Sequence, residues 1–175
     1  MASGVTAMRF SNDGVTWSAF QPYAAAATWT LSGGDGTKTV YAQFRDGSGN
    51  LSPAAGDAIS LDTTGPQATK VRPRSGAEGV NPGVTIRVVV NEALAAGSVT
   101  KRTVVLRQKG EGKVKAEVTY VAARHVIKLV PKKPLDPDAR YVLKVRRVTD
   151  LNGLAWDQKP AVTGAQPLRS TFKTA

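Results

Sequence analysis

The chain contains no cysteine among its 175 residues. Disulfide bridges, cysteine-based zinc sites and thiol nucleophiles are therefore all excluded. It also contains no run of about 18 apolar residues, which excludes a transmembrane helix. Aromatic residues make up only 6% of the chain, so a core has to be filled mainly by Val, Leu, Ile and Ala. Residues 1–4 carry neither the basic nor the apolar part of a signal peptide, so such a peptide would lie outside this sequence.

Turn-forming residues are frequent, with 17 Gly and 10 Pro, while hydrophobic residues still account for 41% of the chain. This combination favours a globular protein of short strands. Pro131, Pro134 and Pro137 exclude a long helix in that region. No segment has a convincing helical period, so the sequence predicts an all-β protein.

Charge divides the chain unevenly. Residues 1–65 hold three basic and five acidic side chains, a net charge of −2, whereas residues 66–175 hold 21 basic and 8 acidic side chains, a net charge of +13. The change coincides with Thr64, Gly65 and Pro66, a sequence typical of a linker. We therefore expect a domain boundary between residues 65 and 66.

Short strands separated by turn signals are predicted in both parts. In the first part we expect strands at residues 5–10, 15–20, 28–31, 37–45 and 58–61, with turns at residues 11–14, 33–36 and 46–50. In the second part we expect seven strands, near residues 69–73, 86–90, 103–108, 113–120, 127–129, 141–146 and 169–174, with a hairpin turn at residues 109–112. Apolar residues alternate with basic ones along several of them, which predicts one buried face and one basic, solvated face.

Several landmarks of the second part lie at residues 71–80, 84–94, 134–141, 148–154 and 170–174. Together they resemble the bacterial immunoglobulin-like domain of S-layer and other surface proteins, and residues 40–50 with 61–66 are similar to the junction between such repeats. The resemblance implies two tandem immunoglobulin-like β-sandwich modules outside the cell. The first, at residues 1–65, would be truncated at its N-terminus, and the second, at residues 66–175, would be complete with seven strands. The missing strands would leave residues 5–10 at an unprotected sheet edge.

The two parts share one local pattern, an aromatic residue on a strand that ends in an acidic turn with Gly and Asn. Tyr41 precedes the turn at residues 46–50, and Tyr141 precedes the turn at residues 150–153. Two interpretations stay open for each side chain. Its hydroxyl bonds the backbone, as in the tyrosine corner of immunoglobulin-like domains, or its ring simply packs in the core.

No residue pattern points to catalysis. His125 is the one histidine, it is expected on a strand with Ile127 and Leu129, and no acidic residue lies within six positions of it. A catalytic histidine needs both a nucleophile and an orienting acid. The acidic residues lie mostly in turns, not in the facing pair that glycoside hydrolysis requires. We therefore predict no catalytic residue and no cofactor, with a structural role for His125.

The pattern nearest to a metal site lies in the first part. Asp46, Ser48 and Asn50 have the alternate spacing of a calcium loop, and Asp57 stands at its twelfth position, but the glycine that the loop requires is missing. Asp and Asn also close turns by bonding their own backbone, and we prefer this interpretation. Asp62 would suit an interdomain calcium site, but no acidic cluster accompanies it in the sequence. We therefore predict no metal site.

Two surfaces could bind a ligand. Trp17, Phe20, Tyr23 and Trp29 could form a platform for sugar rings, although we expect such large aromatic side chains in the core. Basic residues of the second part could merge into a stripe that attracts polyanions. The candidate polyanion-binding residues are Lys101, Arg102, Lys113, Lys115, Lys128, Lys132, Lys133, Lys144, Arg146 and Arg147.

We expect a non-catalytic structural spacer of a larger secreted or cell-surface bacterial protein, with neighbouring immunoglobulin-like repeats as its partners. One alternative is a module that binds an acidic polysaccharide or another polyanion, such as a cell-wall polymer, through its basic face. A further alternative is an accessory role in a carbohydrate-active enzyme. Nucleic acid is disfavoured as a partner because no nucleic-acid-binding motif accompanies the charge.

Overall fold

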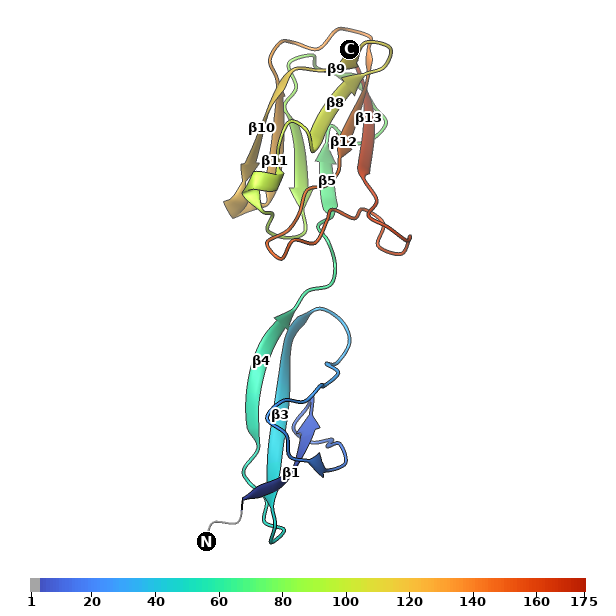
Figure 1. The fold of residues 1–175 in the computed structure, drawn as a ribbon. Coiled ribbons are helices and arrows are strands. Elements are labelled where there is room, and N and C mark those ends of the chain that lie inside the picture. Colours follow the sequence, from blue (N-terminus) through green and yellow to red (C-terminus); the bar gives the residue numbers. More distant parts are fainter. Residues whose placement is uncertain (1–3) are drawn as a thin grey trace. The chain divides into compact units, whose positions relative to one another are not determined.

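A computed structural model describes residues 4–175 of the chain. The chain divides into two compact units, Met1–Thr63 and Thr64–Ala175 (Figure 1). Strands dominate both units, and the helical segments in the described part are two 3-10 turns, η1 (Ala96–Ser98) and η2 (Ala122–Arg124). No helix within residues 4–175 is long and apolar enough to span a membrane. The prediction of an all-β protein is confirmed.

One antiparallel sheet forms the first unit. Its strands are β1 (Val5–Ser11), β2 (Gln21–Pro22), β3 (Gly36–Asp46) and β4 (Ala55–Leu61), in the order β2-β1-β3-β4. Figure 1 shows β3 and β4 running side by side, and their register places Gly36 opposite Leu61 and Ala42 opposite Ala55. The strands expected at residues 5–10, 37–45 and 58–61 are therefore present.

The strands expected at residues 15–20 and 28–31 do not form. Oδ1 of Asp13 accepts the N–H groups of Val15 at 2.8 Å and Thr16 at 2.7 Å, so a side chain takes the donors that a sheet would need. Trp29 donates its Nε1–H to Oδ1 of Asn12 at 2.8 Å. This side-chain bond holds residues 28–31 in place without the backbone hydrogen bonds of a sheet.

β1 is not the open edge that we expected. β2 pairs with it at Ala7 and Met8, and the chain on either side of β2 contributes further backbone bonds. The N–H of Ser18 donates to the carbonyl of Phe10 at 2.9 Å, and the N–H of Tyr23 donates to another β1 carbonyl at 3.0 Å. Among the described residues the two edge strands are the short β2 and the longer β4, and β4 pairs with β3 alone and is exposed along nearly its whole length.

A glycine lets Tyr41 lie across this sheet. Gly56 stands directly opposite Tyr41, and a Cβ atom at Gly56 would lie 2.9 Å from the tyrosine ring. Gly14 also approaches the ring, since a Cβ atom there would lie 3.5 Å from it. Aromatic rings commonly cover a cross-strand glycine in this way. The ring of Tyr41 therefore packs against glycines on the sheet, although the residue is half-buried and does not lie in a core.

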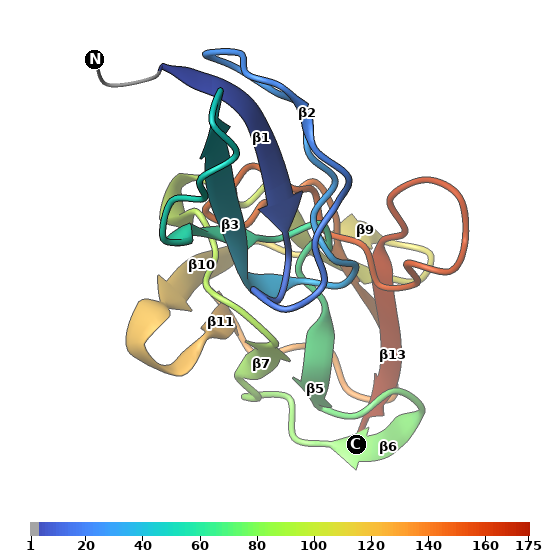
Figure 2. The same cartoon turned by 90° about the horizontal axis from the view of Figure 1, so that it is seen from below.

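Two sheets face each other in the second unit. The first contains, in order, β10 (Ala116–Val121), β11 (Val126–Pro131), β7 (Ile86–Val90) and β5 (Ala68–Arg72). The second contains β6 (Ala77–Val80), β13 (Leu168–Thr174), β12 (Arg140–Val145), β8 (Val104–Gln108) and β9 (Gly112–Lys113). Figure 2 shows β11, β7 and β5 side by side. A cluster of 18 buried hydrophobic residues lies between the sheets, with Ile86 and Ile127 from one and Leu106 and Leu143 from the other.

All seven strands expected in the second unit are present, and their alternation is confirmed. The inward residues of β7 are buried, whereas Arg87 between them is exposed. The inward residues of β11 and β12 are buried as well, and Lys128 and Lys144 between them are half-buried. The strand expected at residues 113–120 is divided, because β9 joins the five-stranded sheet and β10 joins the four-stranded one. β6 is additional. β6 carries the sequence Ala-Glu-Gly-Val, which has no β-branched alternation that could have predicted it.

Tyr141 forms the backbone bond that we considered for a tyrosine corner. Its hydroxyl accepts the N–H of Asp136 at 2.9 Å and donates to Oε1 of Gln108 at 3.3 Å. The ring is 1% exposed and stacks on Phe172, with 5.4 Å between the ring centroids. Burial raises the pKa of the Tyr141 hydroxyl above its ordinary value. The residue thus both fills the core and fixes the loop before β12.

Candidate functional site

The basic residues predicted to form one stripe lie on opposite sides of the second unit. Lys128 of β11 stands opposite Arg87 of β7, in one sheet, and Lys144 of β12 stands opposite Arg169 of β13, in the other. Directly opposite residues share a face of a sheet, and the buried core separates the two sheets. Lys128 therefore lies on a different surface from Lys144, and the structure does not join all ten residues.

The outer face of the five-stranded sheet collects several of the predicted residues. Positive charge on Arg169 lowers the pKa of Lys144 most strongly, followed by desolvation and by the charges of Arg146 and Arg107. A hollow of about 410 Å³ on this unit is bordered by Arg102, Arg107, Lys113, Arg146 and Arg147. Sequence reasoning missed Arg107 and Arg169, although both take outward positions on expected strands.

Other predicted lysines surround a groove beside β8, β9 and β10. Its two adjoining parts, of about 560 and 390 Å³, share Lys113, Lys115 and Lys132. Lys101 borders one part, whereas Lys133 borders the other. Apolar side chains of the core line the groove as well, and so do two carboxylates; these residues are Leu106, Val118, Leu129, Glu111 and Asp136. Ammonium groups above an apolar floor can bind an anion that also carries an apolar group.

His125 does not lie on a strand, contrary to our expectation. It follows the 3-10 turn η2 between β10 and β11, with a left-handed backbone at φ 49°. Its carbonyl accepts the N–H of Val90 at 2.9 Å. This place in a turn, with a backbone bond to β7, accounts for the residue without any catalytic chemistry.

Asp46 closes its turn with its own carboxylate. Oδ1 accepts the N–H groups of Ser48 and Asn50, each at 2.9 Å, and Oδ2 accepts the side-chain amide of Asn50 at 2.9 Å. Asp57 lies on β4, where its Oδ1 accepts the N–H of Ala58 at 2.9 Å. These bonds support the turn interpretation over a calcium loop, because the turn already uses both oxygens of Asp46.

The aromatic side chains of the first unit are partly exposed, which corrects the expectation that they fill a core. Tyr23 is 51% exposed. The guanidinium of Arg9 lies 4.9 Å from the ring centroid of Trp17 and 4.8 Å from that of Phe20, and Arg45 lies 4.3 Å from that of Phe20. The arginines therefore cover ring faces on which a sugar would have to stack.

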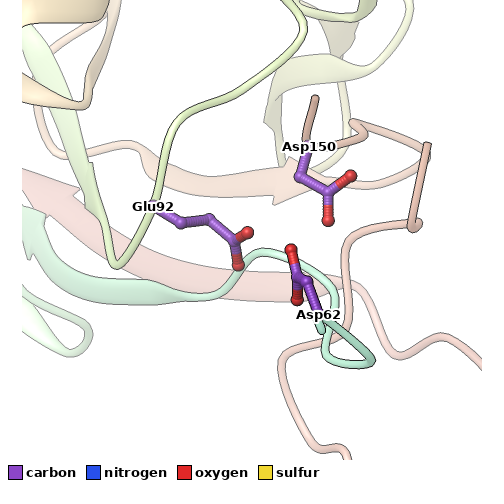
Figure 3. Close-up of side chains that lie close together, drawn as sticks. All are labelled: Asp62, Glu92 and Asp150. Carbon is purple, nitrogen blue, oxygen red and sulfur yellow. The ribbon is translucent and has the colours of Figure 1, made fainter. Parts of the chain in front are cut away.

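Three acidic side chains come together from distant parts of the sequence. Asp62, Glu92 and Asp150 each offer one carboxylate oxygen, and these oxygens lie within 4.8 Å of one another. Figure 3 shows the three carboxylates turned toward one another. Sequence reasoning considered Asp62 alone, because no motif or spacing connects it with positions 92 and 150.

Comparison with known proteins places the chain in a family. No curated protein matches it. Among solved structures it is similar to the crystal structure of PcoC, a methionine-rich copper resistance protein from Escherichia coli, with 18% identity and a TM-score of 0.49 over 64% of this chain and 100% of that one. The selenomethionine form of PcoC gives 17% identity and a TM-score of 0.48, over 62% of this chain and 99% of that one. Residues 62–174 match the family model of the bacterial Ig-like domain, and since this is more than half of its length, the chain belongs to that family.

Proposed function

We propose that the chain is a structural spacer of a larger bacterial protein that is secreted or held at the cell surface, in the manner of S-layer-type repeats. Its partners would be neighbouring immunoglobulin-like modules, and the first unit would be a partial module of the same kind. Membership of the bacterial Ig-like domain family, which is non-catalytic, supports this role. The shared placement of Tyr41 and Tyr141 before acidic turns supports the relation between the units.

The pairing of β6 with β13 carries the proposal. The two strands are parallel, with Ala77 opposite Phe172. Backbone bonds extend the pair at both ends: the N–H of Gly76 donates to the carbonyl of Thr171 at 2.7 Å, and the N–H of Ala175 donates to a β6 carbonyl at 3.0 Å. β6 lies near the start of the second unit and β13 at its end. Force on the two ends would therefore load these bonds in shear, so that they have to break together.

Single-molecule pulling tests this mechanical role. The chain has no native cysteine, so introduced pairs define the pulling points. Pulling between Thr64→Cys and Ala175→Cys loads β6 and β13 in shear, whereas pulling between Pro137→Cys and Ala175→Cys unzips the antiparallel pair of β12 and β13 one bond at a time. We expect a clearly higher unfolding force for the first pair. Equal forces would reject the mechanical role.

A second candidate function is the binding of an acidic polysaccharide, such as a cell-wall polymer, on the outer face of the five-stranded sheet. The crowding of positive charge that lowers the pKa of Lys144 favours it. Lys144→Glu should elute from heparin at lower salt than the unchanged chain. Lys128→Glu makes the same charge change on the other sheet and should have a smaller effect. Equal shifts would mean that net charge alone sets retention, against a specific binding face.

A further inference from the structure

We propose that a groove in the second unit binds an amphipathic anion, a single molecule with one acyl chain and a negatively charged head. The site is the part of the groove beside β8 and β10 that has a volume of about 390 Å³. This volume lies within the range of about 300–1,000 Å³ that is usual for small-molecule sites. The site is built from the second unit alone, and it does not depend on the spacer or the polysaccharide function.

Two edge strands of unequal length open the groove. β9 and β10 are edge strands of the two facing sheets, and β9 has two residues whereas β10 has six. Val118 of β10 stands opposite the buried Leu129 of β11, so both side chains face inward. Val118 is nevertheless only half-buried. The short β9 therefore leaves inward apolar side chains of β10 without a complete cover.

Backbone bonds fix the place where the chain passes from one sheet to the other. The N–H of Val114 donates to the carbonyl of Leu106 at 2.9 Å, which ties Val114 to β8 in the five-stranded sheet. The N–H of Lys132 donates to the carbonyl of Lys115 at 2.9 Å, which ties Lys115 to the residue that follows β11 of the other sheet. The crossing is thus held from both sides, as expected for a preformed site.

Apolar side chains from both sheets line the groove. β8 contributes Val104 and Leu106, whereas β10 and β11 contribute Ala116, Val118 and Leu129. Val104 and Leu106 are each 1% exposed and belong to the hydrophobic core, so the groove reaches that core. An acyl chain placed there would exchange water for an apolar surface, and the hydrophobic effect therefore favours its binding.

Four lysines border the same groove and determine the charge of the ligand. They are Lys101, Lys113, Lys115 and Lys132. Nζ of Lys113 donates to the carbonyl of Lys101 at 2.7 Å, which holds this ammonium group beside the groove. No acidic residue among those described lines this part, and the ion pairs of the unit join other side chains. Positive charge that no carboxylate neutralises attracts an anion, so the head of the ligand should be negative.

Calorimetric titration of the full chain with decanoate, kept below its micelle-forming concentration, tests the site. We expect one decanoate per chain and no measurable binding of acetate, which has the charge without the chain. Decanol has the chain without the charge and should bind roughly tenfold more weakly or less, because hydrogen bonds to charged groups are stronger than neutral ones.

A pair of lysine changes tests the charged part of the site. Lys115→Gln combined with Lys132→Gln should weaken decanoate binding roughly tenfold or more and leave decanol binding almost unchanged. Lys70→Gln combined with Lys159→Gln removes the same charge at two exposed positions that do not line the groove, and it should leave both affinities unchanged.

Filling the groove tests the apolar part. Val118→Trp places a large ring among the lining residues without changing the charge, and it should abolish decanoate binding. The melting temperature of this variant shows whether it folds, and the lysine pair provides the test if it does not. Loss of decanoate binding in the lysine pair, with normal binding in its control, would support the proposal.

Four results would overturn the proposal. They are the absence of decanoate binding, equal binding of acetate and decanoate, equal binding of decanol and decanoate, and equal weakening in the two lysine pairs. Sedimentation with phosphatidylglycerol vesicles distinguishes a single bound molecule from a membrane surface. Vesicle binding by a chain that does not bind decanoate would also contradict the proposal, because the lysines would then contact headgroups of a bilayer instead of one molecule in a groove.

Discussion

The two units are built from strands of similar pattern, but only the second has a facing layer. Its two sheets enclose 18 buried hydrophobic residues. In the described part of the first unit, Ala7, Met8 and Ser11 are buried, and the aromatic side chains remain partly exposed. Alternation of apolar and polar residues along the chain is enough to specify strand pairing. A core additionally requires a second layer against which the apolar face of the sheet can pack. We therefore expect the second unit to be much the more stable of the two.

The largest effect should come from removing core side chains of the second unit. Leu143 is 1% exposed, and Leu143→Ala should lower the free energy of unfolding of this unit by about 2–5 kcal/mol. Met8→Ala is the matched change in the first unit, where fewer apolar groups surround the side chain, and it should cost less. Urea unfolding followed by tryptophan fluorescence measures both. A larger loss of free energy of unfolding for Met8→Ala than for Leu143→Ala would contradict the expected difference between the units.

Acid should destabilise the first unit through Asp13. The N–H groups of Val15 and Thr16, followed by the hydroxyl of Ser11, hold the pKa of Asp13 well below its ordinary value of 3.8. Since the pKa is lower in the folded state, the stabilisation is complete above the unfolded value and is lost as the pH falls below about 3.8. The loss of stability caused by Asp13→Ala should therefore be larger at neutral pH than at low pH. If its stability relative to the unchanged chain does not vary with pH, this assignment is wrong.

A smaller effect should follow from removing a cation–π contact in the first unit. Arg45→Gln takes away the guanidinium above the ring of Phe20 and should cost about 0.5–1 kcal/mol. Arg74→Gln, at an exposed position of the second unit, removes the same charge and serves as the control. Thermal unfolding measures both variants. Equal effects would show that loss of charge, rather than the contact with the ring, is responsible.

The smallest effect should appear on the basic face of the second unit. The neighbouring Arg169 lowers the pKa of Lys144, so the charged ammonium is disfavoured in the folded state. Lys144→Gln should therefore raise the melting temperature slightly at low salt, and salt should reduce this gain by screening. For the unchanged chain, stability should rise as the pH increases through the lowered pKa of Lys144 toward its ordinary value of 10.5. Destabilisation by Lys144→Gln at low salt would contradict this view.

Sequence could predict the strands of the second unit because each has apolar residues on one side and polar residues on the other. It could not predict that residues 15–20 stay irregular, since the side chain of Asp13 takes their backbone donors. The meeting of Glu92 with Asp150 depends on the bridge that Asp150 forms with Leu94, a long-range pairing that leaves no mark in local spacing. The separation of Lys128 from Lys144 likewise depends on which sheet each strand joins.

Native-state hydrogen exchange on the full chain tests the unequal stability of the two units most directly. We expect the amides of β1 and β4 to exchange well before those of β7 and β12, because the latter strands cannot open without exposing the enclosed core. Protection of β1 and β4 equal to that of β7 and β12 would contradict the account, since a single sheet with so few buried side chains could not provide it.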